Sequence, residues 1–457
     1  MLGQFVNMLD RNGGASGGRH FVHNATLSLV WLAMATSGFV FTEPAPTDIL
    51  ALGLIVILPV VGLFRPSPLL AILMLLFAGI AASGLVSATL ANDAGKAVSH
   101  TLVSLFLAGA AFTFAGFIAV KPVAHLRIIF NGLTVAAVMV ALTGIAGYFD
   151  AFAGAEIFTK FGRAAGTFKD PNVFGPFLVP AFLYAIHTAL ERSIKHVALP
   201  LALTAFLAFA TFLSFSRGAW MNIILALATY IALSFLTAES NGRRQKIAVL
   251  AVLGAAMIAA VVGGALQVEK IAGLVGERAS VAQSYDVGPE GRFGGQEKAI
   301  GLILEYPLGI GAGSFAFDHH HEEPHNVYLS MPLNAGWAGA GLYLAAIALT
   351  LLLGIQQAFK RTPWQPLVLI AVSAFLANVA EGLIIDTDHW RHFYLLMGVI
   401  WGAASVPSPV ASFVPSRFPR LVPRLVPRLV PSLVPRLIPS KSGPHRLRGR
   451  LQVGSSA

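Results

Sequence analysis

Long runs of apolar residues, separated by short polar stretches, recur along most of the chain. A helix that crosses a bilayer needs about 20 mostly apolar residues. We predict twelve spans, at roughly 24–42, 48–64, 68–90, 99–120, 127–147, 172–190, 197–214, 218–238, 247–267, 326–353, 366–386 and 392–406. The runs are continuous rather than alternating, which favours helices over the strands of a barrel. The pattern therefore predicts an all-α polytopic membrane protein.

One polar interval is much longer than the others. Residues 268–325 separate the ninth predicted span from the tenth, and 293–305 within them have the pattern of a short amphipathic helix. The run PLGIGAGSF that follows is rich in glycine, and it predicts a flexible turn whose backbone N–H groups could approach an anion.

Three regions follow from this pattern: a leader (1–23), a transmembrane domain (24–406) and a basic, proline-rich tail (407–457). The tail repeats the letters R-L-V-P. Proline at every fourth position prevents a helix, so we expect the tail to be disordered.

The composition agrees with a membrane protein. Hydrophobic residues make up 56% of the chain and charged residues only 11%, whereas soluble domains carry about 25% charged residues. The chain has no cysteine, which excludes disulfides, thiolate metal sites and cysteine nucleophiles.

Basic residues indicate how the chain is oriented. With a cytoplasmic N-terminus, the inside connections and the tail hold 21 of the 31 Lys and Arg residues, and 18 of the 21 acidic residues lie outside or near outer helix ends. This is the positive-inside pattern, and it predicts that both termini are cytoplasmic and that 268–325 lies outside. The span centres lack ionisable side chains, which argues against an ion-coupled transporter.

Unusual polar residues gather on the predicted outer side. Arginines occur there in four segments that are far apart in the sequence: Arg163, Arg217 in the tight turn SFSRGAW, Arg292 in the long loop, and Arg391 in DTDHWRH. A guanidinium group pairs bidentately with phosphate. A single arginine is explained equally well as an interfacial anchor, and Arg391 could simply pair with Asp388. Their convergence predicts a polar site at the outer boundary of the membrane.

Residues 319–326 read HHHEEPHN. His321 and His325 have the i,i+4 spacing that can bind a metal on a helix, but Pro324 prevents a helix there, and we predict no metal site. We interpret His319 to Glu323 as a solvated approach to a span that opens at Asn326. His325 lies at the mouth of that span, where a partly desolvated neutral imidazole can act as a general base.

Several motifs, taken in order, resemble the O-antigen ligase and polymerase superfamily of bacterial envelope glycosyltransferases. They are RAAGTFKDPNVFG, FSRGAW, RFGGQ with PLGIGAGSF ten residues later, and HNVYL followed by NAGWAG. The resemblance runs from about 160 to 405, whereas the first five spans match only in hydropathy.

The resemblance implies an inner-membrane enzyme that transfers a glycan from undecaprenyl diphosphate to an acceptor hydroxyl at the periplasmic face. It implies no cofactor, no metal and no nucleic acid partner, and a protein surrounded by membrane lipids. Arg217 and Arg292 match the positions that hold the diphosphate, and His325 matches the proposed general base of an inverting transfer. Three further residues are candidates for the substrate groove: Arg163, Arg391 and Asn326.

The resemblance leaves the acceptor open. A ligase, which we favour, uses lipid A–core, whereas an O-antigen or exopolysaccharide polymerase uses another lipid-linked glycan. Some relatives were once described as bicarbonate transporters, so a small-solute transporter is the remaining alternative.

Overall fold

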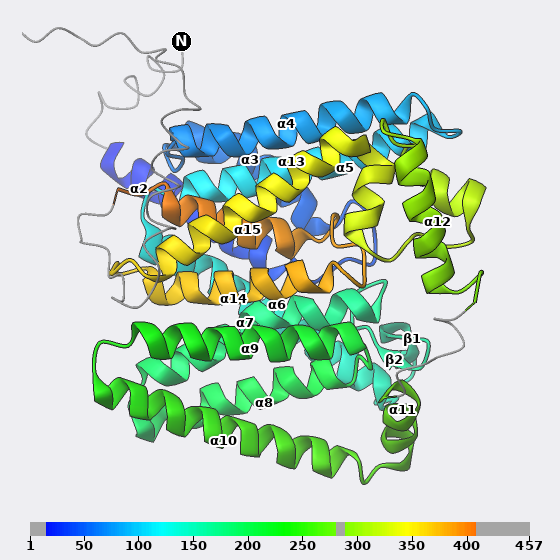
Figure 1. Ribbon diagram of the computed structural model, residues 1–457. Coiled ribbons are helices and arrows are strands. Elements are labelled where there is room, and N and C mark those ends of the chain that lie inside the picture. The colour runs from blue at the N-terminus through cyan, green and yellow to red at the C-terminus, as the bar shows by residue number, and fades with distance from the viewer. Residues whose placement is uncertain (1–14, 280–287, 408–457) are drawn as a thin grey trace, which may run out of the picture. The chain divides into compact units, whose positions relative to one another are not determined.

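The computed structural model describes residues 15–279 and 288–407, and most of these residues are helical (Figure 1). The longer helices are α2 (Ala15–Ala35), α3 (Pro46–Val61), α4 (Pro68–Ala88), α5 (Ala94–Ile118), α6 (Pro122–Tyr148), α7 (Pro171–Glu191), α8 (Ala198–Phe212), α9 (Arg217–Thr237), α10 (Asn241–Ala265), α11 (Glu269–Ala279), α12 (Arg292–Glu305), α13 (Val327–Ala358), α14 (Gln365–Glu381) and α15 (Arg391–Ala404). The short elements are η1 (Ala155–Phe158), η2 (Ile194–His196), the π-helix η3 (Phe315–His319), and an antiparallel pair of strands, β1 (Thr159–Lys160) and β2 (Arg163–Ala164).

The prediction of an all-α polytopic membrane protein is confirmed. Each of the twelve predicted spans coincides with a helix, namely α2 to α10 and α13 to α15. In the described part of the chain, seven helices are long and apolar enough to cross a membrane, and α3, α8 and α14 are apolar but shorter. The number of spans therefore stays a prediction. The amphipathic helix expected at 293–305 is present as α12. Residues 1–14 of the predicted leader and 408–457 of the predicted tail lie outside the described residues.

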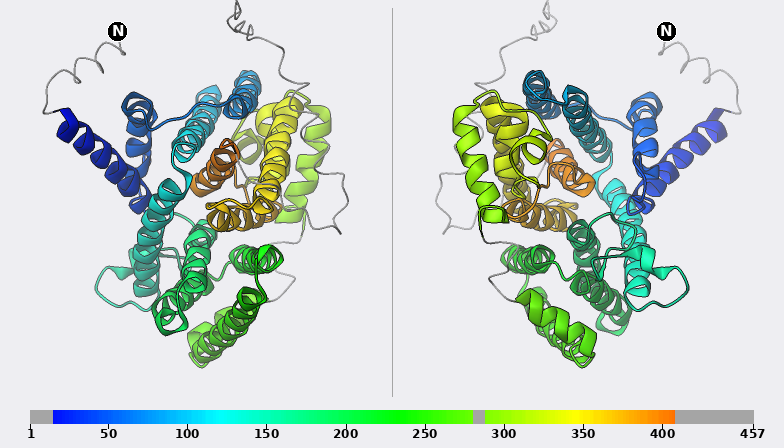
Figure 2. Two further views of the ribbon diagram at one scale, coloured as in Figure 1. Left: turned by 90° about the vertical axis from the view of Figure 1, so that its left-hand side faces the viewer. Right: turned by 90° about the vertical axis from the view of Figure 1, so that its right-hand side faces the viewer.

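Helix α15 lies in the middle of one group of helices, between α5, α13 and α14 (Figure 2). Gly398 and Gly402 of α15 face α5, and a Cβ at either position would lie 2.5 Å from the carbonyl oxygen of Ala111 or 2.6 Å from that of Ala115. Small residues four positions apart let two helix backbones approach closely in a membrane. The indole of Trp401 is fully buried and donates a hydrogen bond of 2.7 Å to Thr350 Oγ1 of α13, which satisfies its polar atom inside the protein.

Four connections lie at one end of the helices, which we call the loop-rich end: 149–170, 213–216, 382–390 and the described parts of the long connection, 266–279 and 288–326 (Figure 1). Hydrogen bonds join these connections to one another. The backbone N–H of Ala164 donates to the carbonyl of Leu213 over 3.0 Å, and Arg292 Nη2 donates to the carbonyl of Ile384 over 2.7 Å. The long loop and the shorter connections therefore form one structure.

The glycine-rich run 309–313 docks against a break in α13. Gly336 has φ 65° and ψ −179°, which interrupts the helix and leaves the carbonyl of Leu333 available to the run. The backbone N–H groups of Ile310 and Gly311 donate to that carbonyl over 2.8 and 3.2 Å. These two N–H groups are used inside the protein, so they do not approach an anion.

We expect Gly336→Ala to destabilise the protein by roughly 1–3 kcal/mol, because a side chain is strained at this backbone conformation. The new Cβ would also lie 2.8 Å from the carbonyl oxygens of Pro307 and Leu308. Thermal unfolding in detergent, followed by circular dichroism, measures the effect. Gly341→Ala is the matched control, since a Cβ at this position of the same helix meets no atom within 4 Å. Equal melting temperatures for the two variants would contradict the account of the break.

Candidate functional site

Arg217 is the first residue of α9. Ser216 caps the helix, its Oγ accepting a hydrogen bond of 3.2 Å from the backbone N–H of Ala219. The next residue, Gly218, lies against the end of α14. A Cβ there would lie 2.7 Å from Glu381 Oε1 and 3.2 Å from Ile384 Cδ1. A side chain at this position would have to displace the end of the Glu381 side chain, so glycine favours the close approach of α9 to α14.

Arg163 holds the turn that carries Arg217. It is buried, with Nε donating to the carbonyl of Ser214 over 2.6 Å and Nη2 donating to Asn172 Oδ1 over 2.7 Å. Asp170 caps α7 by accepting from the backbone N–H of Asn172 over 2.8 Å, and the helix begins at Pro171, one residue before the predicted span. These contacts give Arg163 a role in positioning the 213–216 connection, and its place in the substrate groove stays a prediction.

Arg292 is the first residue of α12 and joins two other segments. Its Nη2 donates to the carbonyl of Ile384 over 2.7 Å and lies 3.4 Å from the carbonyl oxygen of His325. Asn326 is the N-cap of α13, and its side chain accepts from the backbone N–H of Tyr328 over 3.0 Å. The prediction that a helix opens at Asn326 is confirmed, and its side chain is used in the cap.

Residues 381–386 connect the three residues that the motifs single out. Glu381 and Ile384 lie against Gly218, next to Arg217. The carbonyl of Ile384 accepts from Arg292, and the carbonyl of Gly382 accepts from the backbone N–H of Val327, two residues after His325. The fold thus brings Arg217, Arg292 and His325 into one region of the loop-rich end, although they are far apart in the sequence.

The imidazole of His325 is partly desolvated and has a carboxylate partner. Its side chain is 35% exposed, and Nε2 lies 3.3 Å from Glu322 Oε2. The backbone of His325 has φ 50°, a left-handed conformation that is uncommon outside glycine. A carboxylate that holds one imidazole nitrogen orients the ring and stabilises it when it gains a proton.

Sequence reasoning missed a group of carboxyl side chains near His325. Burial, with Asp386 and Asp388 nearby, raises the pKa of Glu323 to about 7. Burial also disfavours ionisation of Asp388, but the hydrogen bond with His100 and the positive charge of His389 outweigh it and lower the pKa of Asp388 to about 2. The interpretation of His319 to Glu323 as a solvated approach is therefore wrong for Glu323.

The same interpretation is wrong for His320. This residue is only 8% exposed, and its ring packs on Phe315 with centroids 5.9 Å apart. His321 remains exposed and lies near Glu290, with 3.8 Å between His321 Nδ1 and Glu290 Oε2. Pro324 lies in a non-helical stretch, as its type predicts.

Glu323→Gln is expected to stabilise the protein more at pH 8 than at pH 5. The pKa of Glu323 in the folded chain, about 7, is above the ordinary 4.5, so between these values the folded chain holds a proton that the unfolded chain has lost. Stability therefore falls as pH rises through this window. The full shift corresponds to roughly 3 kcal/mol, at about 1.4 kcal/mol per unit, and glutamine removes this cost. Melting temperatures at both pH values measure it, with the exposed Glu290→Gln as control. An equal gain at both pH values would contradict the assignment.

Arg391 has a partner that the sequence does not suggest. Its Nε and Nη2 donate to Asp48 Oδ1 and Oδ2 of α3, each over 2.7 Å. The expected pair between Arg391 and Asp388 is wrong, because Asp388 faces His100 of α5 instead, with 3.4 Å between Oδ2 and Nε2. The charge of Arg391 is compensated within the protein, so its contacts give it a place in packing α15 on α3.

A family model described as O-antigen ligase matches residues 202–344. The match covers about a third of the chain and includes Arg217, Arg292 and His325. No protein of curated function matches the chain. The resemblance that the motifs indicate is thereby confirmed: this multi-pass membrane protein carries, at residues 202–344, a segment that matches the O-antigen ligase model.

Proposed function

We propose that the protein transfers a glycan from an undecaprenyl-diphosphate carrier to the hydroxyl of lipid A–core at the periplasmic face of the inner membrane. One observation carries the proposal. Arg217, Arg292 and His325 lie in segments that the 381–386 region connects at the loop-rich end, and all three belong to the segment that matches the O-antigen ligase model. The distribution of basic residues supports placing this end outside the cytoplasm.

The two arginines suit a diphosphate. Each is the first residue of its helix, α9 for Arg217 and α12 for Arg292. A helix N-terminus carries partial positive charge and favours anions, so the helix dipole adds to each guanidinium charge. During transfer the bond between the anomeric carbon and the phosphate oxygen breaks, and its electron pair remains on the diphosphate. Fixed positive groups stabilise that developing charge.

His325 suits the acceptor side of the reaction. The acceptor oxygen attacks the anomeric carbon from the face opposite the diphosphate, which inverts the configuration at that carbon. As the new carbon–oxygen bond forms, the hydroxyl proton passes to the imidazole. Glu322, 3.3 Å from Nε2, stabilises the imidazolium that results. Arg292 also lies 3.4 Å from the carbonyl oxygen of His325, which couples the position of the base to that of the diphosphate group.

A deletion strain of the source bacterium, profiled for lipopolysaccharide and for lipid-linked glycan, tests the proposal. We expect loss of all long chains together with accumulation of the lipid-linked polymer, and restoration of both by the wild-type gene. A core that carries a single repeat unit would indicate the polymerase alternative. Unchanged glycans, with solute uptake that depends on the protein in vesicles, would overturn the proposal in favour of a transporter.

A further inference from the structure

A second cluster of polar side chains lies at the loop-rich end and takes no part in the proposed transfer. It consists of His100 of α5 with Asp388 and His389 of the 382–390 connection. Each residue offers one ligand atom, and the three atoms lie within 4.8 Å of one another. His100 Nε2 is 3.4 Å from Asp388 Oδ2, and the two imidazole rings have centroids 4.0 Å apart.

These residue types and this spacing suit a transition-metal ion. Two imidazoles and one carboxylate are a common ligand set for Zn²⁺, which binds such atoms at about 2.0–2.2 Å. Two ligands at that distance and a tetrahedral angle are about 3.4 Å apart. The separation of His100 and Asp388 has this value, and the ligand atom of His389 lies within 4.8 Å of both of theirs.

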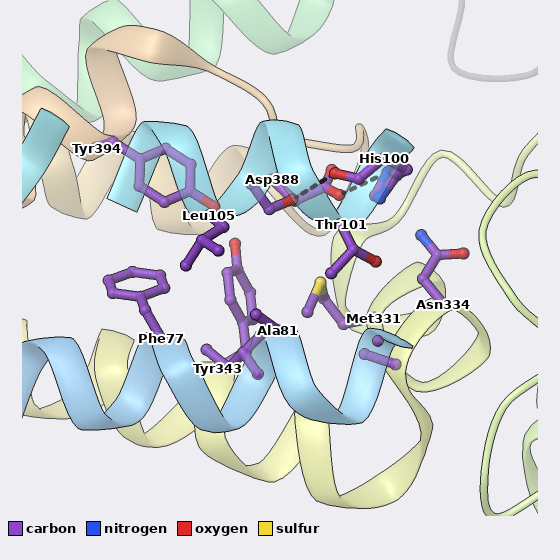
Figure 3. A pocket seen from close by; sticks show the side chains of 14 residues that line it. Phe77, Ala81, His100, Thr101, Leu105, Met331, Asn334, Tyr343, Asp388 and Tyr394 are labelled. Carbon is purple, nitrogen blue, oxygen red and sulfur yellow. Dashed lines mark hydrogen bonds and ion pairs between the residues drawn. The ribbon is translucent and has the colours of Figure 1, made fainter. Parts of the chain in front are cut away.

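The cluster borders a small cavity that Thr101, Asn334 and Tyr343 also line. Figure 3 shows His100 and Asp388 pointing toward each other at its edge. Asp388 is only 5% exposed, and the interaction of its Oδ2 with His100 Nε2, at 3.4 Å, is long for a hydrogen bond. A buried carboxylate oxygen of this kind is costly unless it binds a cation or a donor. Ser104 Oγ lies 2.9 Å from His389 Nε2 and helps to orient that ring.

The surrounding charges also favour a cation. Glu323 and Asp386 each interact unfavourably with the carboxylate of Asp388, and His100 and Lys96 offset part of the repulsion at Glu323. A divalent ion bound at Asp388 relieves this repulsion.

We propose that His100, Asp388 and His389 form a binding site for a divalent transition-metal ion, represented by Zn²⁺. The ion ties the start of α5 to the 382–390 connection. The carbonyl of Ile384, which accepts a hydrogen bond from Arg292, belongs to the same connection. The ion therefore stabilises the connection that positions Arg292, and it takes no part in the reaction.

Another group of potential ligands provides the control. Glu290, His320 and His321 also place their ligand atoms within 4.8 Å of one another. The side chains of His321 and Glu290 are 55% and 74% exposed, and they face water rather than a buried carboxylate. We expect this group to bind zinc weakly.

The experiment titrates Zn²⁺ into the full chain, stripped with a chelator and embedded in lipid nanodiscs, after purification without a histidine tag. Competition with a chromophoric chelator gives the affinity, and elemental analysis gives the stoichiometry. We expect the wild type to bind one Zn²⁺ ion tightly. His389→Ala and Asp388→Asn should each lower the affinity for Zn²⁺ by at least tenfold. His321→Ala is expected to bind as the wild type does. Co²⁺ should show a visible ligand-field band that only the first two variants lose.

Three results would overturn the proposal: no saturable binding by the wild type, wild-type affinity in both cluster variants, or loss of the tight equivalent in His321→Ala. Size-exclusion chromatography and circular dichroism show whether each variant is folded. His389→Gln keeps the size of the side chain and replaces His389→Ala if the latter is misfolded. None of these measurements uses glycan transfer, so the proposal and the proposed function fail separately.

Discussion

His325→Ala is expected to lower the rate of glycan transfer by about 10²–10⁴-fold, the usual contribution of a positioned general base. The acceptor hydroxyl then has no group to take its proton, while the diphosphate region keeps both arginines. The measurement is turnover by purified protein with a lipid-linked glycan, together with binding of the donor. We expect turnover to fall and donor binding to stay close to that of the wild type.

His321→Ala is the matched control for the base, because it removes another histidine from the same loop. Its side chain is 55% exposed and contacts Glu290 rather than Glu322. Turnover of His325→Ala within tenfold of the control would exclude the imidazole as the base. Raising the pH should partly restore the turnover of His325→Ala. Hydroxide can replace a missing base, but it cannot replace a missing structural contact.

Removing either guanidinium is expected to cost about 10²–10³-fold in turnover, as for other groups that stabilise a developing negative charge. Arg217→Ala and Arg292→Ala should also bind the donor more weakly. Arg292 donates to the carbonyl of Ile384, so its alanine variant loses a structural contact as well. Lysine at position 292 keeps the charge but not the fork of donors, and we expect it to recover only part of the rate.

The control for the arginines lies at the other end of the helices. Arg243 pairs with Glu191 over 2.6 Å, and both side chains are largely exposed. Arg243→Ala should leave donor binding and turnover unchanged. A wild-type rate in Arg217→Ala and Arg292→Ala, with the control equally active, would remove the diphosphate role from both residues.

Features that depend on local sequence could be predicted. The length and continuity of the apolar runs give a helix for each predicted span, and the amphipathic pattern gives α12. Proline and Asx capping preferences give the starts of α7 at Pro171 and of α13 after Asn326. Each of these features is decided by residues within one or two helical turns.

Features that depend on long-range packing could not be predicted from the sequence. Asp48 is 343 residues from its partner Arg391, and His100 meets Asp388 across most of the chain. No spacing rule connects such residues. Arg163 is a candidate for a groove by type and position, but packing directs its guanidinium at the carbonyl of Ser214. Glu323 is half-buried only because α5 and the 382–390 connection come close to it.

Reconstituted transfer tests the central claim most directly. The purified chain is placed in liposomes with an undecaprenyl-diphosphate-linked glycan and lipid A–core, and the products are followed by mass spectrometry. The account predicts glycan joined to the core, with an inverted anomeric linkage and one undecaprenyl diphosphate released per transfer. It also predicts that the triple variant of Arg217, Arg292 and His325 to alanine forms no product. Product formation by that folded triple variant at the wild-type rate would contradict the account.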